Sequence, residues 1–251
     1  MNYYRLMRFT GFIIGIAAAL TMWGAQPPAT GGMSAVRALK FDKYAQANDS
    51  LPAPGKDEKR IVFFGSSITE GWMAEHPEFF EKHGYIARGI SGQSTYALLL
   101  RFRADAIDLE PACIVLGVGE PDIAAGDDDY DENRTFANIE TMCELARLHG
   151  IQIVLTSVLP AENYYWNQKA TDVPDKIESL NNRIRDYAQL HRIPYADYYT
   201  PLVHPGDRAL PVTFSDDGVH PNGFGYTIME PVIQAILKKL PSRPSASKKG
   251  E

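Results

Sequence analysis

Five short apolar runs, separated by longer stretches of helical periodicity, constrain the fold of this chain most strongly. The runs cover residues 61–64, 85–90, 113–116, 151–158 and 193–198. They are apolar throughout rather than alternating, a pattern typical of parallel strands that are covered on both faces. Strands that alternate with helices imply right-handed crossover connections. The pattern therefore predicts an α/β fold, a three-layer α/β/α sandwich around a parallel sheet.

Helical periodicity is clearest between the third and fourth runs, where residues 135–149 repeat apolar side chains along one helix face. Gly150 follows at the position where helices commonly end. Residues 175–191 and 226–240 show a similar spacing. We expect one more short helix near residues 36–46.

The two ends of the chain differ in composition from this regular region. Residues 1–25 place Arg5 and Arg8 before an uncharged stretch and small residues, which is typical of a secretory signal peptide. The apolar stretch is shorter than the roughly 20 residues that a membrane span needs, although an uncleaved anchor is an alternative. We therefore expect a secreted or periplasmic protein without a stable span in its mature form. Residues 26–59 are interpreted as an N-terminal extension, 60–240 as one domain, and 241–251 as a disordered basic tail.

Charge and cysteine content exclude several functional classes. The chain carries 25 basic and 31 acidic residues, a net charge of −6, and so lacks the electrostatic signature of a nucleic-acid-binding protein. Cys113 and Cys143 are the two cysteines, too few for a disulfide framework. Each is interpreted as a small buried apolar residue.

A serine follows the first predicted strand, in the sequence Gly65-Ser66-Ser67. Ligands of open parallel sheets bind beyond the carboxyl ends of the strands, and a serine there can face a substrate. The backbone N–H groups after it can point at an anion. The motif differs from the nucleophile elbow of α/β-hydrolases, because Thr69 stands where that elbow needs glycine. An ordinary turn is the alternative interpretation.

Near the end of the domain, Asp217 and His220 lie three residues apart before a predicted helix. At this spacing a carboxylate can reach one ring nitrogen of the imidazole and leave the other free to face a serine. A helix cap or a pair of metal ligands would give the same spacing. No further His or Cys lies close in sequence, which disfavours a metal site. We expect neither a metal nor a cofactor.

Together these motifs resemble the first and last sequence blocks of the GDSL (SGNH) hydrolases. The sequence from Arg88 to Ser94 is similar to the second block, whose glycine (here Gly92) donates its backbone N–H to an oxyanion. The resemblance covers about residues 60–240. It implies a flavodoxin-like sheet of five strands in the order 2-1-3-4-5. It also implies ester hydrolysis through an acyl-enzyme, with Ser67 as nucleophile, His220 as base and Asp217 as its orienting carboxylate.

The chain departs from the family pattern in the third block, which normally reads Gly-x-Asn-Asp and here reads Gly119-Glu120-Pro121-Asp122. The family asparagine donates a side-chain N–H to the oxyanion, whereas proline has no donor. The implied oxyanion hole is thereby reduced to the N–H groups of Ser67 and Gly92. Loss of one donor typically costs about 10²–10³ in rate. Asn163, just beyond the fourth predicted strand, is a candidate replacement. The residue before the nucleophile is Ser66 rather than the family's Asp or Asn.

Aromatic residues after the fourth strand indicate the substrate class. Tyr164 and Trp166 are candidates to bind substrate, since exposed aromatics at this edge can stack on a sugar. By resemblance to the secreted acetylesterases of the family, we expect hydrolysis of short acetyl esters on carbohydrate. A lysophospholipase or thioesterase is an alternative that would need a long apolar groove. A weakened carbohydrate-binding protein on the same fold is the non-enzymatic alternative, favoured by Pro121.

Overall fold

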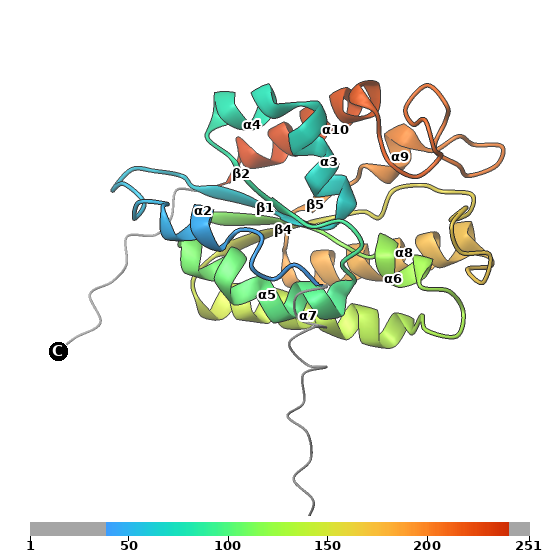
Figure 1. Cartoon of the computed structure of the whole chain (residues 1–251), viewed down its shortest axis with the longest axis horizontal. Helices are drawn as coiled ribbons and strands as arrows, with labels where there is room; N and C mark the ends of the chain where they lie inside the picture. Colours follow the sequence, from blue (N-terminus) through green and yellow to red (C-terminus); the bar gives the residue numbers. More distant parts are fainter. Residues whose placement is uncertain (1–38, 241–251) are drawn as a thin grey trace, which may run out of the picture. The chain divides into compact units, whose positions relative to one another are not determined.

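The structure is a computed structural model that describes residues 39–240 (Figure 1). The predicted signal peptide, 1–25, and the predicted tail, 241–251, lie outside the described residues. The predicted N-terminal extension, 26–59, is described from Leu39 onward. Leu39 is also the first residue of the compact unit that contains the rest of the described chain.

Five parallel strands form one sheet in the order β2-β1-β3-β4-β5, which confirms the predicted fold class and strand order. The strands are β1 (Ile61–Gly65), β2 (Ile86–Gly89), β3 (Cys113–Gly117), β4 (Gln152–Thr156) and β5 (Tyr195–Ala196). The fifth strand is much shorter than the apolar run 193–198 predicted. Ser157 explains this difference, because its Oγ accepts the backbone N–H groups of Tyr198 and Tyr199 in place of a neighbouring strand.

Nine α-helices lie among residues 39–240, together with one 3₁₀ turn, Ile107–Leu109. They are α2 (Ala45–Asp49), α3 (Ser67–Glu75), α4 (Pro77–His83), α5 (Thr95–Asp105), α6 (Glu120–Ala124), α7 (Glu132–Leu148), α8 (Val173–His191), α9 (Tyr199–Leu202) and α10 (Gly223–Leu237). The three long predicted helices correspond to α7, α8 and α10. The short helix expected near 36–46 is wrong in position: residues 39–44 form turns, and α2 begins at Ala45.

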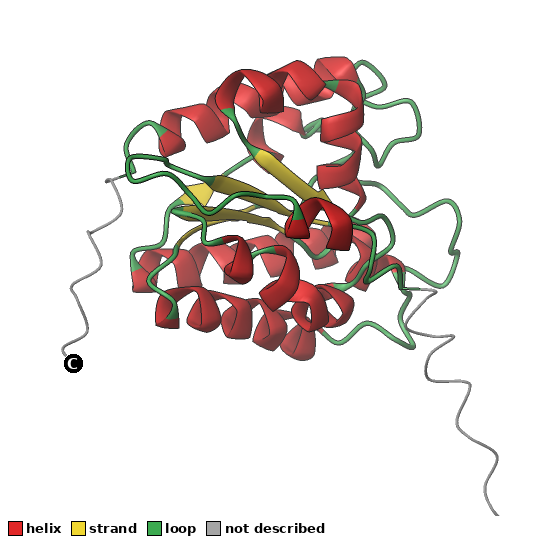
Figure 2. Cartoon of the chain, turned by 60° about the vertical axis from the view of Figure 1, so that its left-hand side comes forward, coloured by secondary structure: helices red, strands yellow, loops and turns green. Residues whose placement is uncertain are grey.

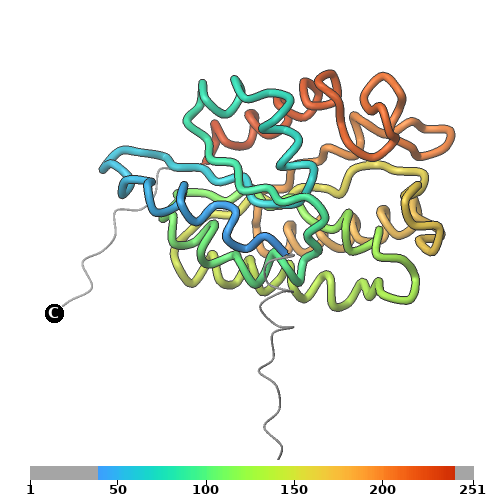
Figure 3. Tube along the Cα trace, in the orientation of Figure 1, coloured from blue at the N-terminus to red at the C-terminus, as the bar shows by residue number. Residues whose placement is uncertain are grey.

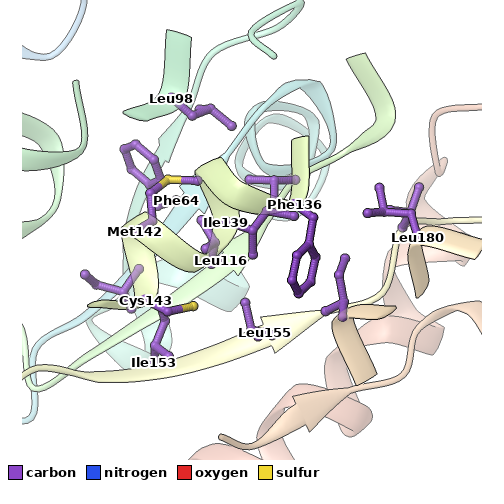
Figure 4. Packing of buried hydrophobic residues seen from close by; sticks show 14 of the residues in the cluster. Phe64, Leu98, Leu116, Phe136, Ile139, Met142, Cys143, Ile153, Leu155 and Leu180 are labelled. Carbon is purple, nitrogen blue, oxygen red and sulfur yellow. The ribbon is translucent and has the colours of Figure 1, made fainter. Parts of the chain in front are cut away.

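Helices cover both faces of the sheet (Figure 2). Alternate residues of each strand enter different clusters, because side chains of a strand point to opposite faces. Phe63 packs with α3, α4 and α10 on one face. Phe64 packs with α5 and α7 on the other, beside Ile139 and Met142 (Figure 4). Full burial of such a side chain stabilises the fold by about 1.5–3 kcal/mol.

The first turn of α3 lies very close to the carboxyl ends of β1 and β2. A Cβ atom on Gly65 would come within 2.4 Å of the Gly117 carbonyl oxygen and the Thr69 hydroxyl. A Cβ on Gly89 would lie 2.2 Å from the backbone nitrogen of Glu70. Glycine at these strand ends therefore permits the approach that brings the start of α3 to the edge of the sheet.

Residues 39–59 lie against the sheet domain, along the side that carries α5 (Figure 3). The Tyr44 hydroxyl donates to the carbonyl of Gly89, and Asn48 Nδ2 donates to Asp105 Oδ1 at 2.7 Å. This segment is thus fixed by polar contacts with the sheet end and with α5. None of the helices within residues 39–240 is long and apolar enough to cross a bilayer.

The close approach of α3 yields a stability prediction. Replacing Gly89 with alanine should lower the free energy of unfolding by about 1–3 kcal/mol, because the new methyl group meets backbone rather than a flexible side chain. Urea denaturation measures this change. Gly55→Ala is the matched control, since its Cβ would lie 3.8 Å from the nearest atom, and it should shift stability by less than about 0.5 kcal/mol. Equal stabilities for the two variants would contradict the packing described for α3.

Candidate active site

The structure brings Ser67, Asp217 and His220 together at the carboxyl edge of the sheet. Ser67 is the first residue of α3, and its Oγ lies 3.0 Å from His220 Nε2. His220 Nδ1 lies 2.7 Å from Asp217 Oδ2. Two segments separated by 153 positions in the chain therefore form one continuous hydrogen-bond chain.

The surroundings of Asp217 keep its carboxylate ionised. Partial burial alone would raise the pKa of Asp217, but hydrogen bonds from the His220 ring and from the backbone N–H groups of His220 and Val219 lower it to about 2. An ionised carboxylate only accepts hydrogen bonds. The Nδ1–H of His220 therefore donates to Asp217, which leaves Nε2 to accept the hydroxyl proton of Ser67.

Ser215 shapes the loop that presents this carboxylate, and nothing in the sequence pattern indicated it. Its Oγ donates to Asp217 Oδ1 at 3.1 Å and accepts the Gly218 N–H at 2.9 Å. Gly218 has a φ of +78°, a conformation that glycine adopts without strain. Ser215 is almost fully buried, so the loop is anchored from within the protein.

One cavity of about 650 Å³ is lined by the candidate nucleophile, its base and the candidate oxyanion residues other than Asn163. Ser67, Gly92, Pro121 and His220 all line it. Gly92 has a φ of +77°, and no atom lies within 4 Å of where its Cβ would stand. The first N–H groups of a helix have no partner within the helix, and Ser67 stands at such a position in α3. The backbone N–H groups of Ser67 and Gly92 thus belong to residues that face the same space.

Pro121 and Asn163 lie in different places. Pro121 is the second residue of α6 and lines the cavity that contains Ser67, but it offers no N–H. Asn163 is exposed and lines a second cavity, of about 410 Å³, which borders Asp217 and Gly218 but not Ser67. The structure therefore does not bring Asn163 to Ser67, because the chain after β4 places Asn163 in the wall of the neighbouring cavity.

The two acids beside Pro121 are buried and were not singled out from the sequence. Asp122 accepts the backbone N–H of Thr95 at 2.9 Å and its hydroxyl at 2.6 Å, which joins α6 to the first turn of α5. Burial raises the pKa of both Glu120 and Asp122. Glu120 lines the cavity of Ser67, so a buried carboxyl group forms part of its wall.

Aromatic side chains after β4 form another part of the wall. Trp166 is about half exposed, and its ring lies 6.0 Å from the His220 ring at an interplanar angle of 21°. Tyr164 is only 1% exposed and lies under Trp166, with 5.4 Å between ring centroids. Asn167 fixes this loop by donating to the carbonyls of Ala124 and Ala125. Of the two aromatic candidates, Trp166 therefore presents the larger free surface.

Within residues 39–240, no group of three or more His, Cys, Asp or Glu side chains is arranged to hold a metal ion. Cys113 and Cys143 are both buried and unpaired.

Comparisons with known proteins agree with this geometry. The model of the GDSL-like lipase/acylhydrolase family matches residues 63–228. A GDSL-like lipase from Bacteroides thetaiotaomicron is 49% identical in sequence, with a TM-score of 0.78 over 80% of this chain and 99% of the other. An acetylxylan esterase from Geobacillus stearothermophilus, 15% identical, shares the fold with a TM-score of 0.60 over 74% of this chain and 95% of its own.

One curated relative is an acetylxylan esterase from Xylanibacter ruminicola, 23% identical over 228 residues. That match covers 75% of this chain and 45% of the relative, so the chain spans about half the length of this relative. The family match covers most of the sheet and reaches from β1 to α10, including all three residues of the hydrogen-bond chain. The chain belongs to the GDSL-like lipase/acylhydrolase family.

Proposed function

We propose that the enzyme removes short acyl groups, acetyl above all, from carbohydrate esters by way of an acyl-enzyme on Ser67. The observation that carries this proposal is the hydrogen-bond chain from Asp217 through His220 to Ser67 at the wall of one cavity. A serine activated by a base, which is itself oriented by a third group, is the arrangement that nucleophilic catalysis requires.

In the first half of the reaction, Ser67 Oγ attacks the ester carbonyl carbon while His220 Nε2 takes the hydroxyl proton. The protonated imidazole is stabilised by the ionised Asp217. The bond to the alcohol then breaks, and His220 returns the proton to the departing alkoxide oxygen. In the second half, water attacks the acyl-enzyme with His220 again as base, which releases the carboxylic acid and restores Ser67.

The backbone N–H groups of Ser67 and Gly92 stabilise the negative charge on the carbonyl oxygen in this proposal. Both residues line the cavity, and Gly92 leaves open space where a side chain would stand. Such donors act on charge that develops in the transition state. Pro121 contributes none, so the oxyanion hole has two donors rather than three.

The proposed substrate class rests on the aromatic wall and on the relatives. The half-exposed face of Trp166 beside His220 is suited to a sugar ring, with Tyr164 supporting it from below. Two relatives described above are acetylxylan esterases. The leader pattern of residues 1–25, outside the described residues, supports a secreted or periplasmic location, where such esters on polysaccharide are accessible.

The central test is the serine itself. Ser67→Ala should abolish hydrolysis of an aryl acetate, because no other group in the cavity combines a nucleophilic oxygen with the His220 base. A fluorophosphonate, which reacts only with an activated serine, should label the wild type and not this variant. The free energy of unfolding should change by less than about 0.5 kcal/mol, because the side chain is small and backbone hydrogen bonds hold its turn. Unchanged turnover would refute the catalytic assignment, and a wild type that resists labelling would favour the carbohydrate-binding alternative.

Acyl-chain preference tests the substrate class. Acetate esters should show a higher kcat/KM than octanoate esters of the same alcohol. Ser91, Ser94 and Glu120 place polar groups among the apolar and aromatic residues of the cavity wall, which disfavours a long apolar chain. A series of aryl esters with acyl chains from two to eight carbons measures this preference. A kcat/KM that rises with chain length would instead support the lysophospholipase or thioesterase alternative.

A further prediction concerns the hydrogen-bond donor that is missing at Pro121. Pro121→Asn should raise kcat by at least about tenfold with little change in KM, because a donor to the developing oxyanion acts in the transition state. Asn163→Ala is the matched control and should leave kcat unchanged, since Asn163 lines a different cavity. A neutral Pro121→Asn, in a wild type that is already fast, would mean that another group fills the third position. A large loss in Asn163→Ala would identify that group.

A further inference from the structure

The loop that follows β2 carries Gly92 in a turn closed by one backbone hydrogen bond, from the Gln93 N–H to the Ile90 carbonyl at 3.3 Å. Ser91 and Gly92 are both exposed, and Gly92 adopts a left-handed backbone conformation. A backbone donor stabilises an oxyanion only if its position is set before the reaction. Contacts from outside the loop therefore supplement this single hydrogen bond in holding the Gly92 N–H in place.

Glu70 provides such contacts on one side of the loop. It lies on α3, three residues beyond Ser67, and its Oε2 accepts the backbone N–H of Ser91 at 2.6 Å. The same oxygen accepts the Ser91 hydroxyl. Hydrogen bonds to an ionised acceptor are stronger than those between neutral groups. Because both donors come from one residue, Glu70 fixes the position and the orientation of Ser91, the residue that precedes Gly92.

Lys43 is the charge partner of Glu70. Its Nζ forms a salt bridge with Glu70 Oε1 and donates to the Gly89 carbonyl at 3.1 Å. Partial burial alone would raise the pKa of Glu70, but hydrogen bonds from Lys43 and Ser91 lower it below its ordinary value. The carboxylate therefore stays charged while it accepts these donors.

A second group of contacts holds the other side of the loop. Gln93 is 2% exposed, and its side-chain amide donates to the Leu39 carbonyl and accepts from Arg101 Nε. Arg101 also donates to the carbonyls of Gly65 and Arg88, each at 2.9 Å. The loop is thus tied to the ends of β1 and β2 and to the start of the described chain.

Residues 39–49, which we call the N-terminal strap, take part in both groups of contacts. Asn48 holds the far end of the strap, since it donates to Asp105 and accepts from Arg88 Nε at 2.8 Å. The strap lies before residue 63, where the match to the family model begins. Its contacts with the loop therefore lie outside the region that the family model matches.

We propose that Glu70 is the positioning residue for the Gly92 N–H, and that Lys43 of the N-terminal strap orients Glu70 and neutralises its charge. This inference rests on the proposed function, in which Gly92 donates to the oxyanion. A carboxylate one helical turn from Ser67 would repel the developing oxyanion if it were unpaired. The strap thereby becomes part of the working active site although it touches no substrate.

Steady-state kinetics of the full chain on an aryl acetate tests this proposal. Lys43→Met removes the charge partner and leaves the hydrogen bonds from Ser91 to Glu70 in place, so it probes charge and orientation. Glu70→Ala removes both the charge partner of Lys43 and the hydrogen bonds with Ser91. Glu70→Gln keeps an oxygen that can accept the Ser91 N–H, and Lys43→Arg keeps the positive charge. Lys59→Met is the matched control, because Lys59 is an exposed lysine outside the N-terminal strap, and its ammonium donates to the Leu240 carbonyl instead.

We expect kcat to fall about 10- to 100-fold in Glu70→Ala and about tenfold in Lys43→Met, with KM within about twofold of the wild type. Glu70→Gln should be intermediate, and Lys43→Arg should recover most of the activity. The rate of fluorophosphonate labelling should fall in parallel, since that reaction also needs a stabilised oxyanion. Lys59→Met should match the wild type in every measurement.

Two results would overturn the inference alone: a Lys43→Met variant with wild-type kcat, or a loss that appears only in KM or in the urea midpoint. A wild type that neither hydrolyses the acetate nor reacts with the fluorophosphonate would overturn the proposed function, and the inference with it. Measurements on the wild type alone therefore distinguish a failure of the inference from a failure of the proposed function.

Discussion

The tight packing of the first turn of α3 against the ends of β1 and β2 is the constraint on which the site depends. It is possible only because glycine stands at Gly65 and Gly89, where a Cβ would collide with the helix or with the adjacent strand. The approach places Ser67 at the carboxyl edge of the sheet. It also brings the following turn of the same helix, with Glu70, within hydrogen-bonding distance of the loop after β2. One packing feature thus sets both the serine and the loop that faces it.

The opposite wall of the site is organised by charge rather than by packing. Asp217 and His220 lie in a short loop before α10, and their side chains are about one-third exposed. Their geometry is fixed by hydrogen bonds that converge on the carboxylate, from backbone N–H groups and from the buried Ser215. Because those donors favour the ionised form, the carboxylate keeps its charge and with it the orientation of the imidazole. The packed wall and the charged wall meet at the 3.0 Å contact between Ser67 and His220.

The sequence was informative wherever a local pattern determined the structure. The apolar runs predicted the sheet because strands covered on both faces must be apolar throughout, and the family blocks predicted which residues the strand ends would bring together. Contacts between segments distant in sequence carried no such pattern. Loop paths determine that Asn163 is exposed in a separate cavity and that Tyr164 is buried. The short length of β5 depends on single hydrogen bonds such as those of Ser157. The salt bridge between Lys43 and Glu70, 27 positions apart, has no periodicity that could reveal it.

The loss of a side-chain donor at Pro121 and the contacts of Glu70 are connected by the same physical argument. With an asparagine present, three donors share the stabilisation of the oxyanion, and one of them can adjust by rotating its side chain. In the proposed oxyanion hole with two backbone donors, neither donor can adjust independently of the chain that carries it. The Ser67 N–H is fixed by helix α3, whereas the Gly92 N–H lies in an exposed turn that one backbone hydrogen bond closes. An oxyanion hole of this kind depends more heavily on whatever holds that loop. Its working geometry is therefore expected to be set by residues such as Glu70, Gln93 and Lys43, which lie outside the substrate cavity.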